Sequence, residues 1–193
     1  MLNNEIVHLL GNGLSVRHFE SDLFHNEPTD GIRVSCNLGH PHLNCAWTFI
    51  MSTPLFYLCE NLIHFTTPIV VYDSVLYKTR ANTVNPAHLK TFTIHKVLHG
   101  EDKLTNATSG HGAAWISARM YNPKVLHLWG LDYLWTKSIE SINDNLVSHK
   151  AINYHHWWTF WCKIFDTFPK TQFVIHTPTP IENLPKNVVT ERV

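Results

Sequence analysis

The chain has 193 residues, 44% of them hydrophobic, and equal numbers of basic and acidic side chains, 15 of each. This length and apolar content suit one globular domain spanning residues 1–193. The absence of net charge argues against an extended basic surface that binds nucleic-acid backbones, although it is compatible with a local basic patch. Residues 1–13 lack the basic start of a signal peptide and the apolar length of a membrane span, so we expect a cytoplasmic protein without membrane contact.

Six short apolar runs predict β-strands along the chain. They are residues 5–10, 32–37, 46–51, 68–73, 124–130 and 172–176. Several are apolar on both faces, which is typical of strands that helices cover on each side. The sequence therefore predicts an α/β fold with a single Rossmann-like, doubly wound and mostly parallel sheet, with helices on both faces.

Residues 77–108 separate the fourth predicted strand from the first clear helix. They are mostly polar and show weak periodicity. Long irregular segments of this kind often form lids or binding loops. We expect a long excursion over the sheet edge that acts as a lid or contacts the acceptor.

Two helices are predicted in the second half of the chain. Residues 112–121 are rich in small side chains and end at Asn122-Pro123, because proline disfavours helical geometry in the preceding residue. Residues 155–168 carry an apolar stripe at spacings of three and four, formed by Trp157, Trp161, Ile164, Phe165 and Phe168. We interpret the stripe as a core-facing surface rather than a platform for stacking carbohydrate, and leave Trp158 open as a ligand contact.

The histidines and cysteines do not predict a metal site. The four cysteines form no C-x-x-C pair, and the fifteen histidines include only two close groups, His40-x-His42 and His155-His156. Adjacent histidines on a helix point about 100° apart and chelate poorly. We expect neither a metal nor another cofactor.

Polar or glycine-rich turns follow three of the predicted strands. Ligands of open parallel sheets bind beyond the carboxyl ends of the strands, so these turns hold the candidate binding residues. They are Gly11, Asn12, Gly13 and Ser15 after the first strand, Asn37 after the second, and Asp132 and Tyr133 after the fifth. Taken alone, the first turn fits a plain strand-to-helix turn as well as a nucleotide site, since it lacks the third glycine of a dinucleotide fingerprint and the lysine of a P-loop.

A further small-residue turn, formed by Thr108, Ser109 and Gly110, opens the first predicted helix. The amides of a helix N-terminus and two hydroxyls form a group that suits an anion. A plain N-cap explains the same residues equally well, because serine and threonine are common at that position.

Three segments resemble, in order, motifs of the bacterial CMP-sialic-acid-dependent sialyltransferases, glycosyltransferase family 42, and of their short phage-type relatives. The segments are GNGLS at 11–15, SCN at 35–37 and TSGHGAAWISARMYNPKVLHLWGLDYLW at 108–135. That family has a Gly-Asn-Gly-Pro-Ser turn, an Arg-Cys-Asn strand end and a Thr-Ser-Gly helix start followed by Gly-Ile-Asp-Phe-Tyr. The resemblance implies one GT-A-like domain that transfers a sugar from a CMP-activated donor to an acceptor hydroxyl, with inversion and without a metal.

The resemblance also implies a role for each matching residue. It has Asn12 and Gly13 approach the donor phosphate or sugar, Asn37 contact the donor, Ser109 and Gly110 hold the nucleotide, and Asp132 lie near the cytidine ribose. Ser52 stands where the family has a donor-contacting asparagine.

The general base of the family is a histidine just ahead of the helix that leads into the last strand. His155 and His156 match this position, with His149 as the reserve candidate. The assignment suits the chemistry, because an imidazole that titrates near neutrality takes the proton that the acceptor hydroxyl loses.

Departures from the family pattern keep other functions open. Leu14, Ser35 and Leu134 replace a proline, an arginine and a phosphate-gripping tyrosine. Another nucleotide sugar as donor, or a loss of catalysis, is compatible with these changes. The alternatives are a non-catalytic nucleotide-binding or interaction module, and a viral sugar transferase that acts on modified DNA bases. The acceptor, a glycan or another hydroxylated molecule, and the oligomeric state stay open.

Overall fold

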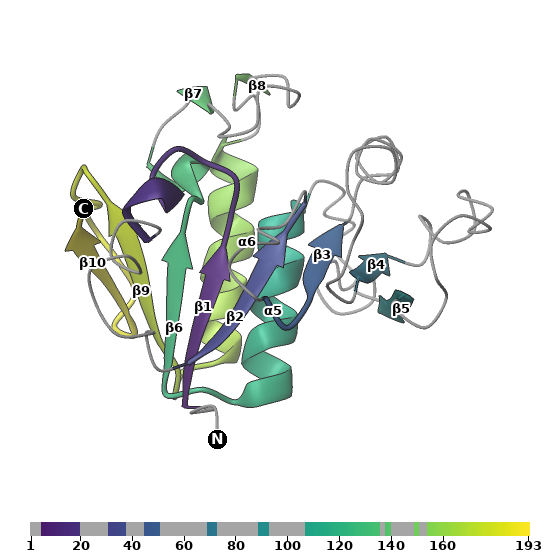
Figure 1. The fold of residues 1–193 in the computed structure, drawn as a ribbon. Helices are drawn as coiled ribbons and strands as arrows, with labels where there is room; N and C mark the ends of the chain where they lie inside the picture. The colour runs from purple at the N-terminus through teal and green to yellow at the C-terminus, as the bar shows by residue number, and fades with distance from the viewer. Residues whose placement is uncertain are drawn as a thin grey trace.

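The computed structural model describes residues 5–19, 31–37, 45–50, 69–72, 89–92, 107–135, 138–139, 149–150 and 154–193. Eight strands in these ranges form one open sheet in the order β10-β9-β6-β1-β2-β3-β4-β5, and every pairing in it is parallel (Figure 1). Their bounds are Ile6–Leu10 (β1), Ile32–Cys36 (β2), Thr48–Ile50 (β3), Ile69–Tyr72 (β4), Leu89–Phe92 (β5), Val125–Trp129 (β6), Gln172–Thr177 (β9) and Val188–Arg192 (β10). Two short strands, β7 (Ser138–Ile139) and β8 (His149–Lys150), pair antiparallel as a separate ribbon.

All six strands predicted from the sequence are present, and the predicted parallel sheet is confirmed. Two strands of this sheet, β5 and β10, were not predicted, and they form its two edges; the short strands β7 and β8 were not predicted either. β5 lies within the expected excursion at 77–108, so part of that segment extends the sheet. Residues 77–88 and 93–106 lie outside the described ranges.

One face of the sheet packs on two helices, α5 (Ser109–Tyr121) and α6 (Tyr154–Thr167), which lie side by side in Figure 1. Alternate strand residues such as Val7, Leu9 and Leu126 point into this core. The small side chains of α5 let it approach β1, β2 and β3 closely, while α6 contributes large aromatic side chains.

The core-facing interpretation of the α6 stripe is confirmed. Trp161, Ile164 and Phe165 are fully buried in the main core, and Trp157 and Phe168 pack at its margin. Trp158, which was left open as a ligand contact, is also partly buried. Its ring meets Phe165 edge-on at 6.2 Å between ring centroids.

The other face of the sheet packs on a helical segment at residues 16–19. Val16 and Phe19 from this segment join Leu10 and Trp129 in a second apolar cluster. Helical structure therefore covers both faces, as predicted. Across the described residues, no helix is long and apolar enough to cross a bilayer.

The order of the strands creates a switch point between β1 and β6. From β1 the chain adds β2, β3, β4 and β5 outward on one side, then returns through α5 to place β6 on the other side of β1. At such a switch the connections leave the sheet in opposite directions, which opens a crevice at the carboxyl ends of the strands.

Candidate nucleotide-binding edge

The turn after β1 and the turn after β6 meet at the switch point and hold each other. The Gly11 amide donates to the Trp129 carbonyl oxygen at 2.7 Å, and the Gly13 amide donates to the Gly130 carbonyl oxygen at 2.8 Å. Two motifs that lie more than a hundred residues apart in the sequence thus meet at the carboxyl ends of β1 and β6.

The two glycines of the first turn are required by this close approach. A Cβ at Gly11 would collide with the Gly130 carbonyl oxygen, and one at Gly13 would lie 2.5 Å from the Asp132 Cγ atom. Gly130 itself has φ +64°, which favours glycine. Contact between the turns therefore explains these glycines without any ligand.

Ser15 and Asp132 form the polar clamp between the turns. The Ser15 hydroxyl donates to Asp132 Oδ1 at 2.5 Å, the Ser15 amide donates to Oδ2 at 3.3 Å, and the hydroxyl accepts from the Gly130 amide at 3.2 Å. Burial raises the pKa of the Asp132 carboxyl, and the hydrogen bonds from Ser15 oppose that rise. In this structure the carboxylate fixes the turn, and its contact with a ribose stays a prediction. Tyr133 follows it in the short 3-10 helix at Asp132–Leu134, but its side chain is not among the described parts.

Asn12 and Asn37 occupy matching places at the carboxyl edge. Leu10 pairs with Ser35 in the register of β1 and β2, and each asparagine lies two residues beyond that pair. The Oδ1 atom of each is buried and has no hydrogen-bond partner among the described residues. A buried acceptor without a partner costs about 1–3 kcal/mol, which a ligand donor would recover. Asn37 also has φ 62°, in the left-handed region.

The start of α5 lies at the same edge and is fixed by His111. The Thr108 amide donates to His111 Nδ1 at 2.9 Å, so the neutral ring carries its proton on Nε2 and donates to the Trp157 carbonyl oxygen at 2.9 Å. This contact joins the first turns of α5 and α6. Thr108 is partly buried, and Ser109 and Gly110 are buried in the first turn of α5.

His111 was not singled out from the sequence. It occupies the position where a capping box usually has glutamate or glutamine, three residues after the Thr108 N-cap, and that spacing is the signal that could have found it. Burial lowers its pKa to about 3. Its ring is fully buried with both nitrogens engaged, so its role is to position the two helices.

The predicted base residues lie at the start of α6. The backbones of His155 and His156 belong to its first turn, immediately before Trp157, which His111 ties to α5. Their side chains lie outside the described parts of the structure, as does that of His149 in β8. Ser52 lies wholly outside them.

The fold and the edge geometry define a Rossmann-like α/β protein with a candidate ligand site at the switch point. Two solved structures resemble it, both of the sialyltransferase CstII from Campylobacter jejuni: one in complex with a substrate analogue, CMP-3FNeuAc, and one with cytidine-5'-monophosphate. Each has a TM-score of 0.51 and 16% sequence identity, covering 89% of this chain and 80% or 79% of theirs. The likeness supports the predicted sialyltransferase-like fold. No family model and no curated protein sequence matches the chain.

Proposed function

We propose that this chain is an inverting glycosyltransferase that moves a sugar from a nucleotide-activated donor, with CMP-sialic-acid-like donors favoured, to an acceptor hydroxyl without a metal. The observation that carries the proposal is the pair of unpartnered acceptors on Asn12 and Asn37 at the carboxyl edge of adjacent strands. Further support comes from the similar fold of a sialyltransferase whose structures hold CMP and a CMP-sugar analogue.

Donor binding would use the groups that meet at this edge. The Oδ1 atoms of Asn12 and Asn37 would accept from hydroxyl or amino groups of the nucleotide or sugar. The first turn of α5, at Ser109 and Gly110, would direct its positive end toward the phosphate. Because no cation neutralises the leaving group in this scheme, these amides and hydroxyls would stabilise its negative charge.

The transfer step would form one bond and break one bond at the anomeric carbon of the donor. The acceptor oxygen attacks from the side opposite the phosphate and its proton passes to His155 or His156. The bond between the anomeric carbon and the phosphate oxygen breaks, and the nucleoside monophosphate departs with the electron pair. Attack from the opposite side inverts the anomeric configuration.

Nucleotide binding is the first test, with CMP compared against UMP and GDP by calorimetry. Asn37→Gly removes the side chain and keeps the left-handed backbone accessible. We expect it to weaken CMP binding about three- to tenfold, the worth of one hydrogen bond. Asn183→Gly is the matched control, since Asn183 also has a positive φ of 56° but is exposed near the C-terminus. If no nucleotide binds, or if both variants bind CMP like the wild type, the proposed site is wrong.

Catalysis is tested by the release of CMP from CMP-sialic acid with a panel of soluble glycan acceptors. The double variant His155→Ala, His156→Ala should keep CMP affinity and lose about 10²- to 10⁴-fold in transfer rate, the usual contribution of a general base. Transfer that survives this change would refute the base assignment. Tight nucleotide binding without consumption of any nucleotide sugar would instead identify a non-catalytic module.

A further inference from the structure

Three histidines from adjacent strands gather on the face of the sheet opposite α5 and α6. His8 of β1 pairs directly with His127 of β6, and His176 comes from the next strand, β9. His8 and His176 are buried and His127 is partly buried. Nothing in the proposed transfer reaction uses these rings, because they lie on the sheet face and not among the turns beyond the strand ends.

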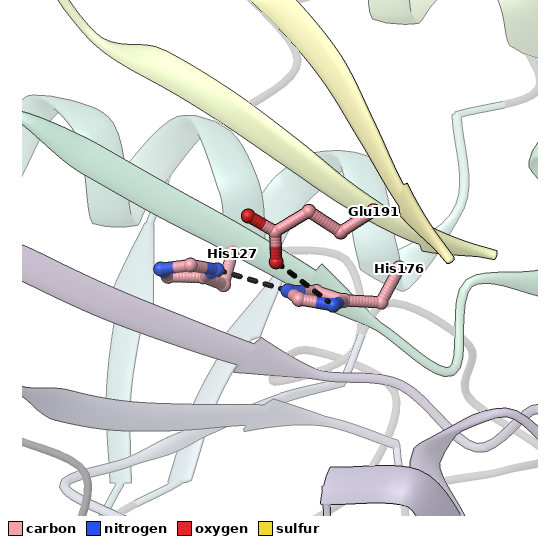
Figure 2. A group of neighbouring side chains, drawn as sticks. All are labelled: His127, His176 and Glu191. Carbon is pink, nitrogen blue, oxygen red and sulfur yellow. Dashed lines mark hydrogen bonds and ion pairs between the residues drawn. The ribbon is translucent and has the colours of Figure 1, made fainter. Parts of the chain in front are cut away.

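Glu191 of β10 completes the group from its outer side. Figure 2 shows its carboxylate beside the ring of His176, with Oε2 3.7 Å from Nδ1, while the other ring nitrogen of His176 faces His127. His127 Nδ1 and His176 Nε2 are hydrogen-bonded at 2.9 Å. The Glu191 side chain is 58% exposed, so the group is open to solvent on this side.

We propose that His127, His176 and Glu191 form a binding site for a divalent transition-metal ion of the zinc type. One ligand atom from each residue lies within 4.8 Å of the other two. Two neutral imidazoles and a carboxylate are a common zinc ligand set, which leaves the fourth tetrahedral position to water.

The geometry needs only a small adjustment to admit the ion. Tetrahedral zinc with bonds of about 2.1 Å holds two ligand nitrogens about 3.4 Å apart. The ring nitrogens of His127 and His176 are 2.9 Å apart, with a proton between them. The ion would take the place of this hydrogen bond as the rings separate by about 0.5 Å. The proton would move to the other nitrogen of the ring that carries it, so both rings stay neutral, and the exposed Glu191 side chain has the freedom to turn toward the ion.

Neighbouring rings hold the two imidazoles in place. The Trp129 indole stacks on His176 with centroids 3.3 Å apart and planes within 6°. The His8 ring stacks on His127 at 4.7 Å, and its Nδ1 accepts from Trp129 Nε1 at 3.3 Å. Ligands that are oriented before binding lose less conformational freedom when the ion arrives.

The protonation state also suits an ion. Burial lowers the pKa of His127 to about 4 and is the largest cause that lowers that of His176 to about 3. Both rings are therefore neutral at pH 7, so each ring has one nitrogen lone pair for a metal without first losing a second proton.

The test is zinc binding by the untagged chain after treatment with EDTA, measured by calorimetry and by the visible absorption of Co²⁺ as a zinc substitute. We expect one tight equivalent and a tetrahedral Co²⁺ spectrum. Glu191→Gln should weaken this equivalent at least about tenfold, while Glu182→Gln, an exposed control nearby in sequence, should not. His127→Gln should abolish it, while the exposed control His18→Gln should leave it intact.

The controls matter because the chain has fifteen histidines, and zinc bound weakly by any of the others would also contribute to the signal. Equal zinc affinity in Glu191→Gln and Glu182→Gln, or loss of the tight equivalent in His18→Gln, would overturn the proposal. Glu191→Gln changes an exposed side chain, so its result does not depend on the folding of the His127 variant. Since no nucleotide is present, failure here is distinguishable from failure of the proposed transfer reaction.

Discussion

Acidification below about pH 6.5 should destabilise this protein strongly, because burial keeps four histidines neutral. Burial is the largest cause that lowers the pKa of His8, His111 and His176 to about 3 and that of His127 to about 4. In the unfolded chain these rings titrate near 6.5. Below about pH 6.5 the unfolded state therefore binds protons that the folded state does not bind. The free energy of unfolding is undiminished above about pH 6.5 and falls as the pH drops toward 4.

The expected loss is comparable with the whole stability of a small domain. At pH 5.5 the protonated form of an unfolded histidine outnumbers the neutral form by about ten to one. This favours unfolding by about 1.4 kcal/mol for each ring that stays neutral when folded. Four such rings give about 5 to 6 kcal/mol. Domains of this size are usually stable by about 5–15 kcal/mol, so we expect unfolding within one to two pH units below 6.5.

Urea denaturation in EDTA at pH 7.5, 6.5 and 5.5, followed by tryptophan fluorescence, measures this loss directly. The fully buried Trp161 and the buried Trp129 report the transition. His8→Gln should reduce the dependence of stability on pH by about a quarter, while the exposed His18→Gln should leave it unchanged. Equal stability at pH 7.5 and 5.5 would refute the reasoning, because it would mean that the rings accept protons in the folded state.

Two further substitutions test how the candidate edge is built. Gly13→Ala should lower stability by about 1–3 kcal/mol in urea denaturation, because its Cβ displaces the buried Asp132 carboxylate. A change below about 0.5 kcal/mol would show that the two turns are not in close contact. His111→Ala should cost about 3–5 kcal/mol in the same assay, since it opens a cavity and removes the hydrogen bonds that His111 makes to the Thr108 amide and the Trp157 carbonyl oxygen. A loss below 1 kcal/mol would contradict the link between α5 and α6.

The central strands were predictable because their physical signal is local. A strand covered on both sides needs apolar side chains in both directions, and IVHLL and VLHLW show this directly. The edge strands carry a weaker signal. β5 reads LKTF, and β10 reads VVTER with exposed charged residues at its end. An edge strand has a neighbour on one side only and is more open to solvent, so the continuous apolar run that marks a central parallel strand is not required of it.

The candidate edge was predictable in its location but not in its internal contacts. Any strand-end turn beside the switch point meets its neighbour there, which is why the GNGLS and GLD segments came together. The sequence could not show that Gly13 makes room for Asp132, because that requirement arises from a residue in another part of the chain. Whether such a glycine serves a ligand or a packing contact is decided by tertiary structure.

The histidine cluster shows a different limit. Metal sites were sought among histidines close in sequence, whereas His127 and His176 meet because β6 and β9 are neighbours in the sheet. A usable signal was present: His8 and His127 each interrupt an otherwise apolar strand, and His176 follows directly after the apolar run FVI of β9. When several neighbouring strands each carry a polar residue at a buried position, those residues are expected to contact one another. Burying a polar side chain without a partner would cost free energy.

The cluster and the candidate edge share one residue, Trp129, so their responses to pH must be separated. Its indole stacks on His176, while its carbonyl oxygen accepts the Gly11 amide of the first turn. If the chain catalyses the proposed transfer, a fall in its rate below pH 6.5 has two sources: protonation of the proposed base histidine in a folded protein, and unfolding caused by protonation of the buried rings. Far-UV circular dichroism during the rate measurement distinguishes them. Protonation of the base lowers the transfer rate and leaves the spectrum unchanged. Unfolding lowers the transfer rate and the helical signal of the spectrum together. If zinc binds the cluster, adding it should move the unfolding transition to lower pH and leave the titration of the proposed base unchanged. The reason is that the ion competes with protons for the ring nitrogens of His127 and His176 only.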